Sequence, residues 1–357
     1  MATSKGKGSS SPKPKTSSST STVVPDVPSI PAQIDPEHQR KVLQHAQRFV
    51  PVIRAGGPAP SRYRFENAMR QNTQEEDFAP RIYIINDVDA EPCPPMDFLF
   101  TNKLIFGEGV PDLTKNAGGC TCEGVCEPLA GKCLCAGLQA AYYDAAHDGE
   151  TLQTGWMYTE DGRLKEFNTR VVECNEHCGC SPDCYNKVVM KGRTVKISVK
   201  KTKNRGWGIS AAENIPQGTF LGYYAGEVVT ASEALERGAI YDQAGSSYLF
   251  DLDFDEHESP TTFEAFSVDA RYVGNHTRFF NHSCNPNCAI TPVQSKSRDP
   301  RLYNLAVFSK VDVKDGEELT FDYAPNSGDL DPALLRTEAV YIPCACGSKD
   351  CRGRIWG

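Results

Sequence analysis

The 357-residue chain has no hydrophobic run long enough to cross a membrane, and its N-terminus lacks the apolar core of a signal peptide. We therefore expect an intracellular protein. The chain also has no internal repeat, no phosphate-cradling loop, and no G-x-G-x-x-G placed between a strand and a helix. These absences argue against a membrane-spanning protein, a repeat array and the common nucleotide-binding folds.

Acidic residues are scarce in the first sixty positions, so the charge is unevenly distributed along the chain. The net charge is −8, but residues 1–60 hold a local +5 and the remainder holds −13. An acidic body argues against direct binding of duplex DNA and suits a basic peptide partner, although a merely soluble acidic surface fits equally well. Residues 1–33 have almost no large apolar side chains, so we expect a disordered tail. Its lysines fit nuclear import or nucleic-acid contact less well than plain solvation.

Cysteine, in contrast, is abundant. Fifteen cysteines in a reducing compartment favour metal binding over disulfides. Nine of them form two groups separated by a long insertion, and we predict these as zinc ligands: Cys120, Cys122, Cys126, Cys133, Cys135, Cys174, Cys178, Cys180 and Cys184. Nine thiolates satisfy three tetrahedral zinc ions if three of them bridge two metals. The alternative is two ordinary zinc sites with one spare thiol. Either way the ligands are all thiolates, which predicts structural zinc.

The C-terminus offers three more thiols, one short of a zinc site: Cys344, Cys346 and Cys351. The best candidate for the fourth ligand is Cys284. It lies in an unusually polar stretch, Arg278–Cys288, which reads R-F-F-N-H-S-C-N-P-N-C. We interpret Cys93 and Cys288 as buried or incidental thiols that bind no metal.

Short strands dominate the expected secondary structure. A helix is predicted from Asp35, with Pro36 at its first position. Residues 56–80 are expected to be irregular. Thr230 and Glu233 form a capping box, and Gly238 is expected to end that short helix. The predicted strands cover residues 81–88, 194–200, 248–253, 305–308 and 318–323.

Four motifs, in this order, carry a family resemblance: R-G-W-G from Arg205, Y-A-G-E from Tyr224, R-F-F-N-H-S-C from Arg278, and E-L-T-F-D-Y ending at Tyr323. With the two cysteine-rich regions, the chain resembles SET-domain protein lysine methyltransferases that have pre-SET and post-SET modules. The likeness is strongest to the fungal heterochromatin-type enzymes that act on lysine 9 of histone H3. It implies a mainly β (β-rich α+β) fold of small twisted sheets, in which the Arg278–Cys288 stretch threads through a pseudoknot.

The resemblance also implies a domain organisation. After the tail, residues 34–80 are expected to hold the packing helix and the irregular segment. The pre-SET zinc-cluster module is expected at 81–192, the SET catalytic domain at 193–325 and the post-SET zinc module at 326–357. The zinc count is then three in the first module and one in the last.

The resemblance further implies a cofactor and a set of site residues. The cofactor is S-adenosyl-L-methionine, and the residues matching its contacts are Arg205, Gly206, Trp207, Tyr248, Arg278, Asn281, His282 and Trp356. A lysine channel is expected from Tyr224, Tyr248, Phe321 and Tyr323, with Tyr323 supplying the essential hydroxyl. Phe321 in place of a tyrosine is typical of enzymes that proceed to trimethyl-lysine.

The expected partner is the histone H3 tail, bound by strand addition. Acidic side chains could meet its basic residues, or form only a solvated loop: Asp251, Asp253, Asp255 and Glu258. We expect a chromatin-bound nuclear monomer acting in heterochromatin and gene silencing. The alternatives are a methyltransferase for another lysine or a non-histone protein, and a non-catalytic zinc-stabilised chromatin scaffold.

Overall fold

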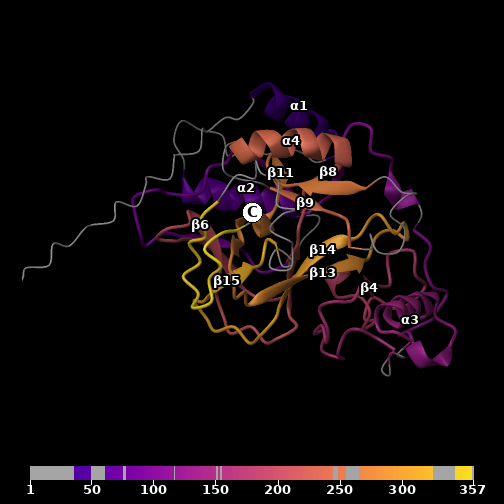
Figure 1. The fold of residues 1–357 in the computed structure, drawn as a ribbon. Helices are drawn as coiled ribbons and strands as arrows, with labels where there is room; N and C mark the ends of the chain where they lie inside the picture. The colour runs from indigo at the N-terminus through magenta and orange to yellow at the C-terminus, as the bar shows by residue number, and fades with distance from the viewer. Residues whose placement is uncertain are drawn as a thin grey trace, which may run out of the picture.

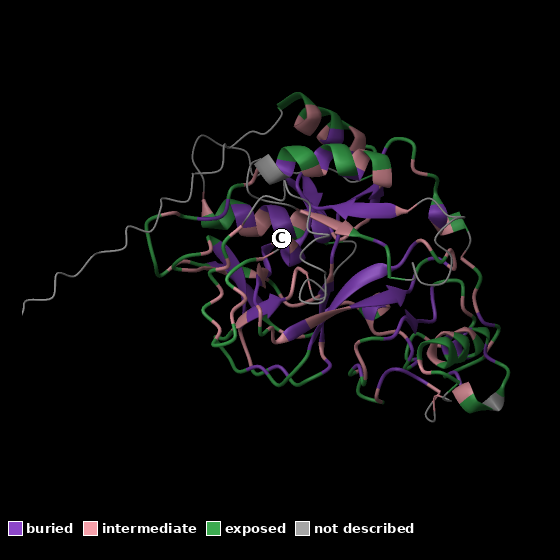
Figure 2. Ribbon diagram, viewed as in Figure 1, coloured by how far each residue is buried: buried purple, intermediate pink, exposed green. Residues whose placement is uncertain are grey.

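The chain is described from a computed structural model, which covers residues 36–49, 61–74, 78–115, 117–149, 152, 155–243, 248–254, 265–324 and 342–355. Small sheets occupy the centre of the molecule, and helices lie at its periphery (Figure 1). The strands are largely buried, whereas the outward faces of the helices are exposed (Figure 2). The expected β-rich architecture is therefore confirmed.

A five-stranded sheet lies beside the polar stretch. Its order is β1 (Tyr83–Ile85), β5 (Ile197–Lys201), β6 (Trp207–Ala211), β15 (Glu318–Phe321) and β12 (Asn281–His282). β15 runs parallel to β12 and antiparallel to β6. The polar stretch therefore meets a strand from nearly forty residues further along the chain, as the threaded topology requires.

A second sheet has the order β3 (Ile105–Phe106), β8 (Glu227–Thr230), β10 (Phe266–Asp269) and β9 (Leu249–Asp251). It packs against α4 (Ala231–Gln243), and Arg237 of that helix binds buried Glu227 and Asp269 at 2.6 and 2.8 Å. A two-stranded sheet joins β2 (Leu99–Phe100) to β11 (Val273–Gly274), and α1 (Pro36–Ala46) packs against β11.

The remaining sheet connects the cysteine-rich region to the rest of the molecule. Its order is β4 (Val171–Val172), β13 (Cys288–Gln294), β14 (Asn304–Ser309) and β7 (Phe220–Tyr223). β4 directly precedes Cys174 and pairs in parallel with the end of β13. Helix α3 (Leu134–Ala146) fixes β4 through Gln139, whose amide bonds the carbonyl of Arg170 and the N–H of Val172. Short 3-10 helices complete the structure: η1 (Leu113–Lys115), η2 (Pro128–Ala130), η3 (Val189–Lys191) and η4 (His276–Phe279).

Two expectations about helices are wrong. Residues 56–80 are not irregular throughout, because α2 (Arg62–Thr73) forms there. Its polar sequence hides a helical spacing of buried residues, among them Phe65 and Met69, which join the main core. Gly238 does not end α4, which continues to Gln243. Tertiary burial of Tyr241, whose hydroxyl binds Asp269 at 2.8 Å, outweighs the roughly 1 kcal/mol cost of an internal glycine.

The other expected elements are found, with small shifts at their ends. α1 begins at Pro36, although its predicted cap Asp35 and the tail 1–33 lie outside the described residues. Thr230 does cap α4, since its hydroxyl accepts the N–H of Glu233 at 3.3 Å. β1, β5, β9, β14 and β15 each fall on a predicted strand.

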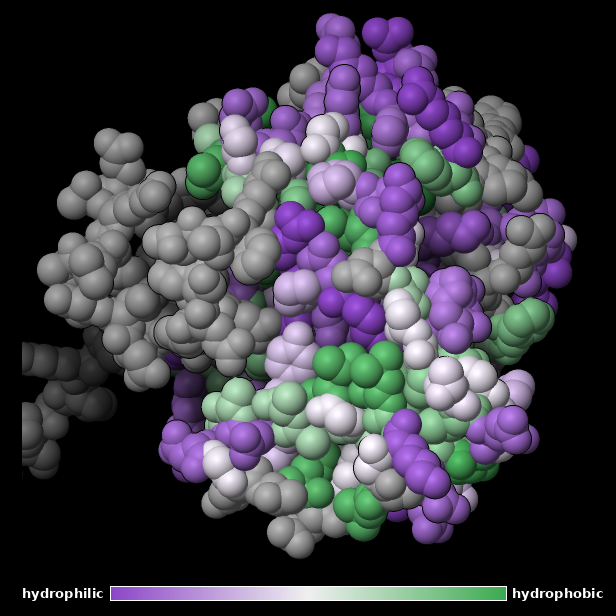
Figure 3. Space-filling model, turned by 90° about the vertical axis from the view of Figure 1, so that its right-hand side faces the viewer, coloured by the Kyte–Doolittle hydropathy of each residue, from purple (hydrophilic) through white to green (hydrophobic). Residues whose placement is uncertain are grey.

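The surface is mixed in character. The face in Figure 3 is mostly hydrophilic in its upper part, and hydrophobic residues gather in its lower half. Exposed apolar side chains of the cysteine-rich region include Leu129 and Leu134. Within the described residues, every helix is too short or too polar to cross a bilayer.

Candidate active site and zinc centres

The nine cysteines of the first region come together around one buried centre. Eight of them form three overlapping groups of four, in which all sulfur atoms lie within 4.8 Å of one another. Three thiols, from Cys120, Cys126 and Cys174, belong to more than one group. Three is the number of bridging thiolates that a nine-thiolate, three-zinc cluster requires. The ninth residue, Cys184, is fully buried, and hydrogen bonding with Cys174 lowers the pKa of its thiol to about 5.

The sulfur separations fit zinc and exclude disulfides. Sγ–Sγ distances are 3.7 Å for Cys120–Cys126, 3.8 Å for Cys126–Cys174 and 3.6 Å for Cys135–Cys178. A disulfide would be about 2.05 Å. Two thiolates on one tetrahedral zinc, each about 2.3 Å from the metal, are separated by about 3.8 Å. The thiols are therefore spaced as the edges of ZnS₄ tetrahedra, and the individual ligand assignments stay predictions.

An arginine from a distant part of the sequence reaches this cluster. Arg298 lies in the connection between β13 and β14, and its Nη2 donates to Cys135 Sγ at 3.2 Å and to the carbonyl of Glu173 at 2.8 Å. The same guanidinium donates to the carbonyls of Gly118 and Gln294 at 3.1 and 3.3 Å. Arg298 therefore joins the cluster, the residue that follows β4 and the end of β13.

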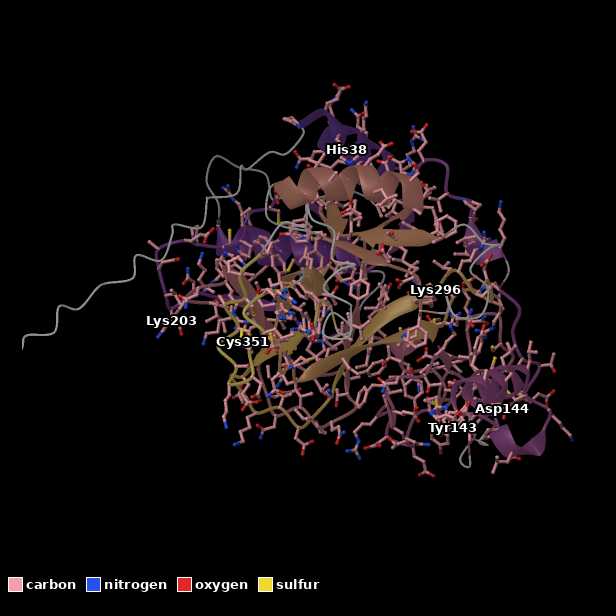
Figure 4. The ribbon with its side chains drawn as sticks, in the orientation of Figure 1. His38, Tyr143, Asp144, Lys203, Lys296 and Cys351 are labelled. Carbon is pink, nitrogen blue, oxygen red and sulfur yellow. The ribbon has the colours of Figure 1, made fainter. Side chains whose placement is uncertain are left out.

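The second zinc centre also assembles. Cys284, Cys344, Cys346 and Cys351 form one group, with Cys284 Sγ at 3.8 Å from Cys344 Sγ and 4.0 Å from Cys351 Sγ. Figure 4 labels Cys351 in the C-terminal tail, whose next residue, Arg352, contacts Asp322 directly after β15. In the described part of the chain, Cys93 and Cys288 belong to none of the possible metal groups, and both are buried.

The aromatic side chains expected to form a channel lie together next to this centre. The rings of Phe321 and Tyr323 are 5.0 Å apart, and the Tyr224 hydroxyl donates to the carbonyl of Tyr248 at 2.9 Å. Phe250 connects the two pairs, at 5.7 Å from the Tyr224 ring and 6.3 Å from the Phe321 ring. The walls suit the aliphatic stem and the cationic head of a lysine.

The hydroxyl groups of Tyr323 and Tyr224 each donate their proton to a backbone carbonyl, so toward a bound group they act as hydrogen-bond acceptors. Tyr323 donates its only hydroxyl proton to the carbonyl of Phe280 at 2.6 Å. Burial raises the pKa of Tyr323, and that of Tyr224, well above the usual value for a phenol. Both remain neutral near pH 7 and can offer only oxygen lone pairs to a bound group. They can orient an amine, but they are not general bases.

A backbone cradle lies at the start of β6. Gly206 has a φ of +64°, and a side chain added there would meet nothing within 4 Å. A Cβ on Gly208 would lie only 2.7 Å from Glu318 Oε1 and 2.8 Å from Asn281 Nδ2. Only glycine lets the backbone approach these two side chains closely. The amide nitrogen of Asn281 donates to Glu318 Oε1 at 2.8 Å and to the Trp207 carbonyl at 3.4 Å, so its oxygen remains to accept a hydrogen bond.

His282 is fixed between the cradle, the channel and the second zinc centre. The Tyr323 N–H donates to its Nδ1 at 3.2 Å, which leaves the Nε2 proton directed at Cys284 Sγ at 3.3 Å. Burial lowers the pKa of His282, in agreement with a neutral ring. Arg205 donates to the His282 carbonyl at 3.0 Å and forms an ion pair with Glu318. Three residues predicted at the cofactor, Arg205, Asn281 and His282, are thus linked in one network that includes Glu318.

Two predicted cofactor residues use their side chains for packing. The Trp207 indole is buried and donates to Glu91 at 3.2 Å. The Arg278 guanidinium lies over the rings of Phe98 at 3.9 Å and Tyr248 at 4.5 Å, and its Nε donates to the Ala270 carbonyl at 3.0 Å. Arg278 therefore supports a channel wall. Trp356 lies outside the described residues.

Sequence reasoning missed three residues of the site: Phe250, Phe280 and Glu318. Phe250 could have been predicted from the sequence, because it lies two residues after Tyr248 in an expected strand, where alternate side chains face the same side. Phe280 acts through its backbone carbonyl, and Glu318 acts as the shared acceptor of Arg205 and Asn281. No spacing rule signals either role.

Family models match most of the folded chain. The Pre-SET motif matches residues 73–187, and the SET domain matches residues 206–324. Together with a 33% identity over 95% of the Neurospora SET domain protein DIM-5, these matches show that the chain belongs to the SET-domain protein lysine methyltransferases.

Three individual relatives show which members of this family the chain resembles. The "Histone-lysine N-methyltransferase, H3 lysine-9 specific" of Schizosaccharomyces pombe is 37% identical over 78% of this chain and 56% of its own length. The Neurospora SET domain protein DIM-5, a histone lysine methyltransferase, is 33% identical, with a TM-score of 0.58 over 69% of this chain and 95% of that chain. KRYPTONITE, solved with DNA, an H3(1-15) peptide and SAH, is 28% identical, with a TM-score of 0.62 over 79% of this chain and 52% of that one. The chain spans only 20% and 56% of the first two curated relatives that it matches.

Proposed function

We propose that this chain is a histone lysine N-methyltransferase that transfers methyl groups from S-adenosyl-L-methionine to lysine 9 of histone H3. The observation that carries the proposal is the cluster of aromatic side chains around the fixed Tyr323 hydroxyl, which lies beside the glycine cradle. Relatives named as specific for histone H3 lysine 9 support the choice of substrate.

The residues of the cradle fit the cofactor. The open backbone at Gly206 would take its main body, and the acceptor oxygen of Asn281 suits the amino edge of an adenine. When bound, S-adenosyl-L-methionine supplies an electrophilic methyl group on a sulfonium. The likeness to KRYPTONITE, solved with SAH, supports this cofactor. The protein then contributes orientation and electrostatics.

The channel prepares the lysine for attack. The amine must be neutral, and burial among Tyr224, Phe250 and Phe321 lowers the pKa of a lysine. With amine and cofactor bound, the phenol oxygens of Tyr323 and Tyr224 would be free to accept hydrogen bonds from the amine and weak C–H contacts from the methyl group. No carboxylate base is required in this scheme.

We propose trimethyl-lysine as the end product. Phe321 is 4% exposed and presents only carbon to the channel. A tyrosine here would add a hydroxyl that holds water and restricts a methylated amine. The apolar ring leaves room for successive transfers.

The histone tail is proposed to pair with β9, which lies at the edge of its sheet among the described residues. Asp251, near the end of β9, is exposed and suits the basic residues of the tail, while Asp255 and Glu258 lie outside the described residues. We further propose that the protein is a monomer of nuclear chromatin that acts in heterochromatin and silencing, and that its folded body does not bind DNA directly. The proposed modules are pre-SET at 81–192, SET at 193–325 and post-SET at 326–357.

The test is methyl transfer from radiolabelled S-adenosyl-L-methionine, with zinc-loaded protein and recombinant H3. A matched H3 in which lysine 9 is replaced by arginine is the control. Label on the first and not on the second supports the proposal. Label on both, or on other members of a peptide array, would assign a different lysine or protein. No transfer by fully zinc-loaded protein would favour a non-catalytic scaffold.

A further inference from the structure

The C-terminal tail is attached to the active site at a second point besides its thiols. Arg352 follows the thiol of Cys351, and its Nη2 donates to Asp322 Oδ1 at 2.6 Å. Its Nη1 donates to the carbonyl of Ala324 at 3.1 Å. Asp322 stands between Phe321 and Tyr323, the two channel residues at the end of β15. One side chain of the tail therefore holds the backbone that carries the channel.

The Asp322 carboxylate is held in the orientation that its contact with Arg352 needs. Asp322 Oδ1 also accepts the N–H of Ala324 at 3.0 Å, which fixes its orientation. The Asp322 side chain is 17% exposed and that of Arg352 is 26% exposed, so water screens the ion pair only in part. A bond between two charged groups in such a place is stronger than an exposed ion pair.

The backbone adds a link to the zinc centre. The N–H of Arg352 lies 3.4 Å from Cys284 Sγ, the same sulfur toward which His282 directs Nε2 at 3.3 Å. The thiols thus fix the position of residue 352, and the guanidinium fixes its direction. Zinc alone would leave the tail free to turn about this one attachment.

We propose that Arg352 is a positioning residue, which through Asp322 holds the zinc-bound tail in register against the channel strand and so completes the cofactor site. This inference rests on the proposed function. It predicts that loss of Arg352 weakens cofactor binding while the zinc of the tail stays bound. The tail should then exchange its amide protons faster, although its metal is present.

The test compares Arg352→Gln with Arg354→Gln, an exposed arginine two residues further on. Zinc content, S-adenosylhomocysteine binding by calorimetry, steady-state kinetics and hydrogen exchange of residues 342–355 are measured on the same preparations. For Arg352→Gln we expect unchanged zinc, about a tenfold rise or more in the Kd for S-adenosylhomocysteine and in KM for S-adenosyl-L-methionine, a smaller change in kcat, and faster exchange. Arg354→Gln should match the wild type in every measurement.

A double variant tests the pairing itself. If Asp322 and Arg352 act as one unit, Asp322→Asn combined with Arg352→Gln should bind S-adenosylhomocysteine about as well as the weaker single variant. Strictly additive losses would overturn the pairing. Wild-type binding and exchange in Arg352→Gln would overturn the whole inference. Failure of the wild type itself to bind S-adenosylhomocysteine would refute the proposed function instead.

Discussion

Replacing Arg298 by glutamine should loosen the nine-thiol cluster, although Arg298 belongs to a different module. A cluster of three zinc ions and nine thiolates carries a charge of −3, and the Arg298 guanidinium touches it through Cys135 at 3.2 Å. Glutamine cannot reproduce four separate donations, and it carries no charge. The variant removes positive charge from the edge of a buried anionic cluster.

The size of the effect follows from the contacts. A hydrogen bond to a charged group contributes about 1.5–3 kcal/mol net, which corresponds to a factor of about 10 to 150 in affinity. Removal of groups that hydrogen-bond to metal ligands typically costs about 10–100-fold in metal affinity. We therefore expect the zinc affinity of the cluster to fall by about one to two orders of magnitude. The zinc affinity of Arg298→Lys should lie between that of the wild type and that of Arg298→Gln. The lysine ammonium keeps the positive charge but lacks the planar set of donors that the guanidinium provides.

Chelator competition with a colorimetric zinc indicator measures this affinity, and total zinc per chain is counted in parallel. The matched control is Arg301→Gln, from the same connection, whose guanidinium binds Asp299 at 2.8 Å. If Arg298→Gln holds zinc as tightly as the wild type and the control, the charge argument is refuted.

Three further predictions concern the other sites. Cys284→Ser should reduce bound zinc from four ions to three and abolish activity while circular dichroism shows the fold largely retained; full activity would disprove the link between metal and channel. Phe321→Tyr should stop mainly at mono- or dimethyl-lysine, by mass spectrometry of an H3 peptide, and unchanged trimethyl product would contradict our account of the channel. Burial raises the pKa of Glu173 from 4.5 to about 7, so the folded state keeps a proton that the unfolded state has lost. Glu173 should therefore make the free energy of unfolding fall as the pH rises from 4.5 to 7. Chemical denaturation at several pH values measures this, and the free energy of unfolding of Glu173→Gln should change less with pH than that of the wild type.

Motif order and cysteine spacing named most of the candidate site residues, because thiol ligands are recognised by their spacing and the aromatic residues by their positions in the family motifs. Cys284 was predicted as the fourth ligand of the tail, and its sulfur does lie among the other three. Roles carried by the backbone or by context could not be predicted this way. The carbonyl of Phe280 and the carboxylate of Glu318 gain their function from strands that meet only in three dimensions.

The two errors about helices have the same origin. Local patterns underestimate elements whose stability comes from tertiary burial. α2 is polar in sequence but buries Phe65, whose ring lies 6.4 Å from that of Phe279. α4 passes through Gly238 because Arg237 and Tyr241, on either side, both bind Asp269.

The central place of β15 has a consequence for how the site is assembled. It is the last strand of the described chain, and it lies between β6, which begins at Trp207, and β12, at Asn281–His282. β15 therefore completes a sheet whose flanking parts, the cradle and the polar stretch, also contact each other directly through Arg205 and Asn281. A variant that stopped before residue 318 would contain both segments but lack the strand between β6 and β12, together with Phe321 and Tyr323.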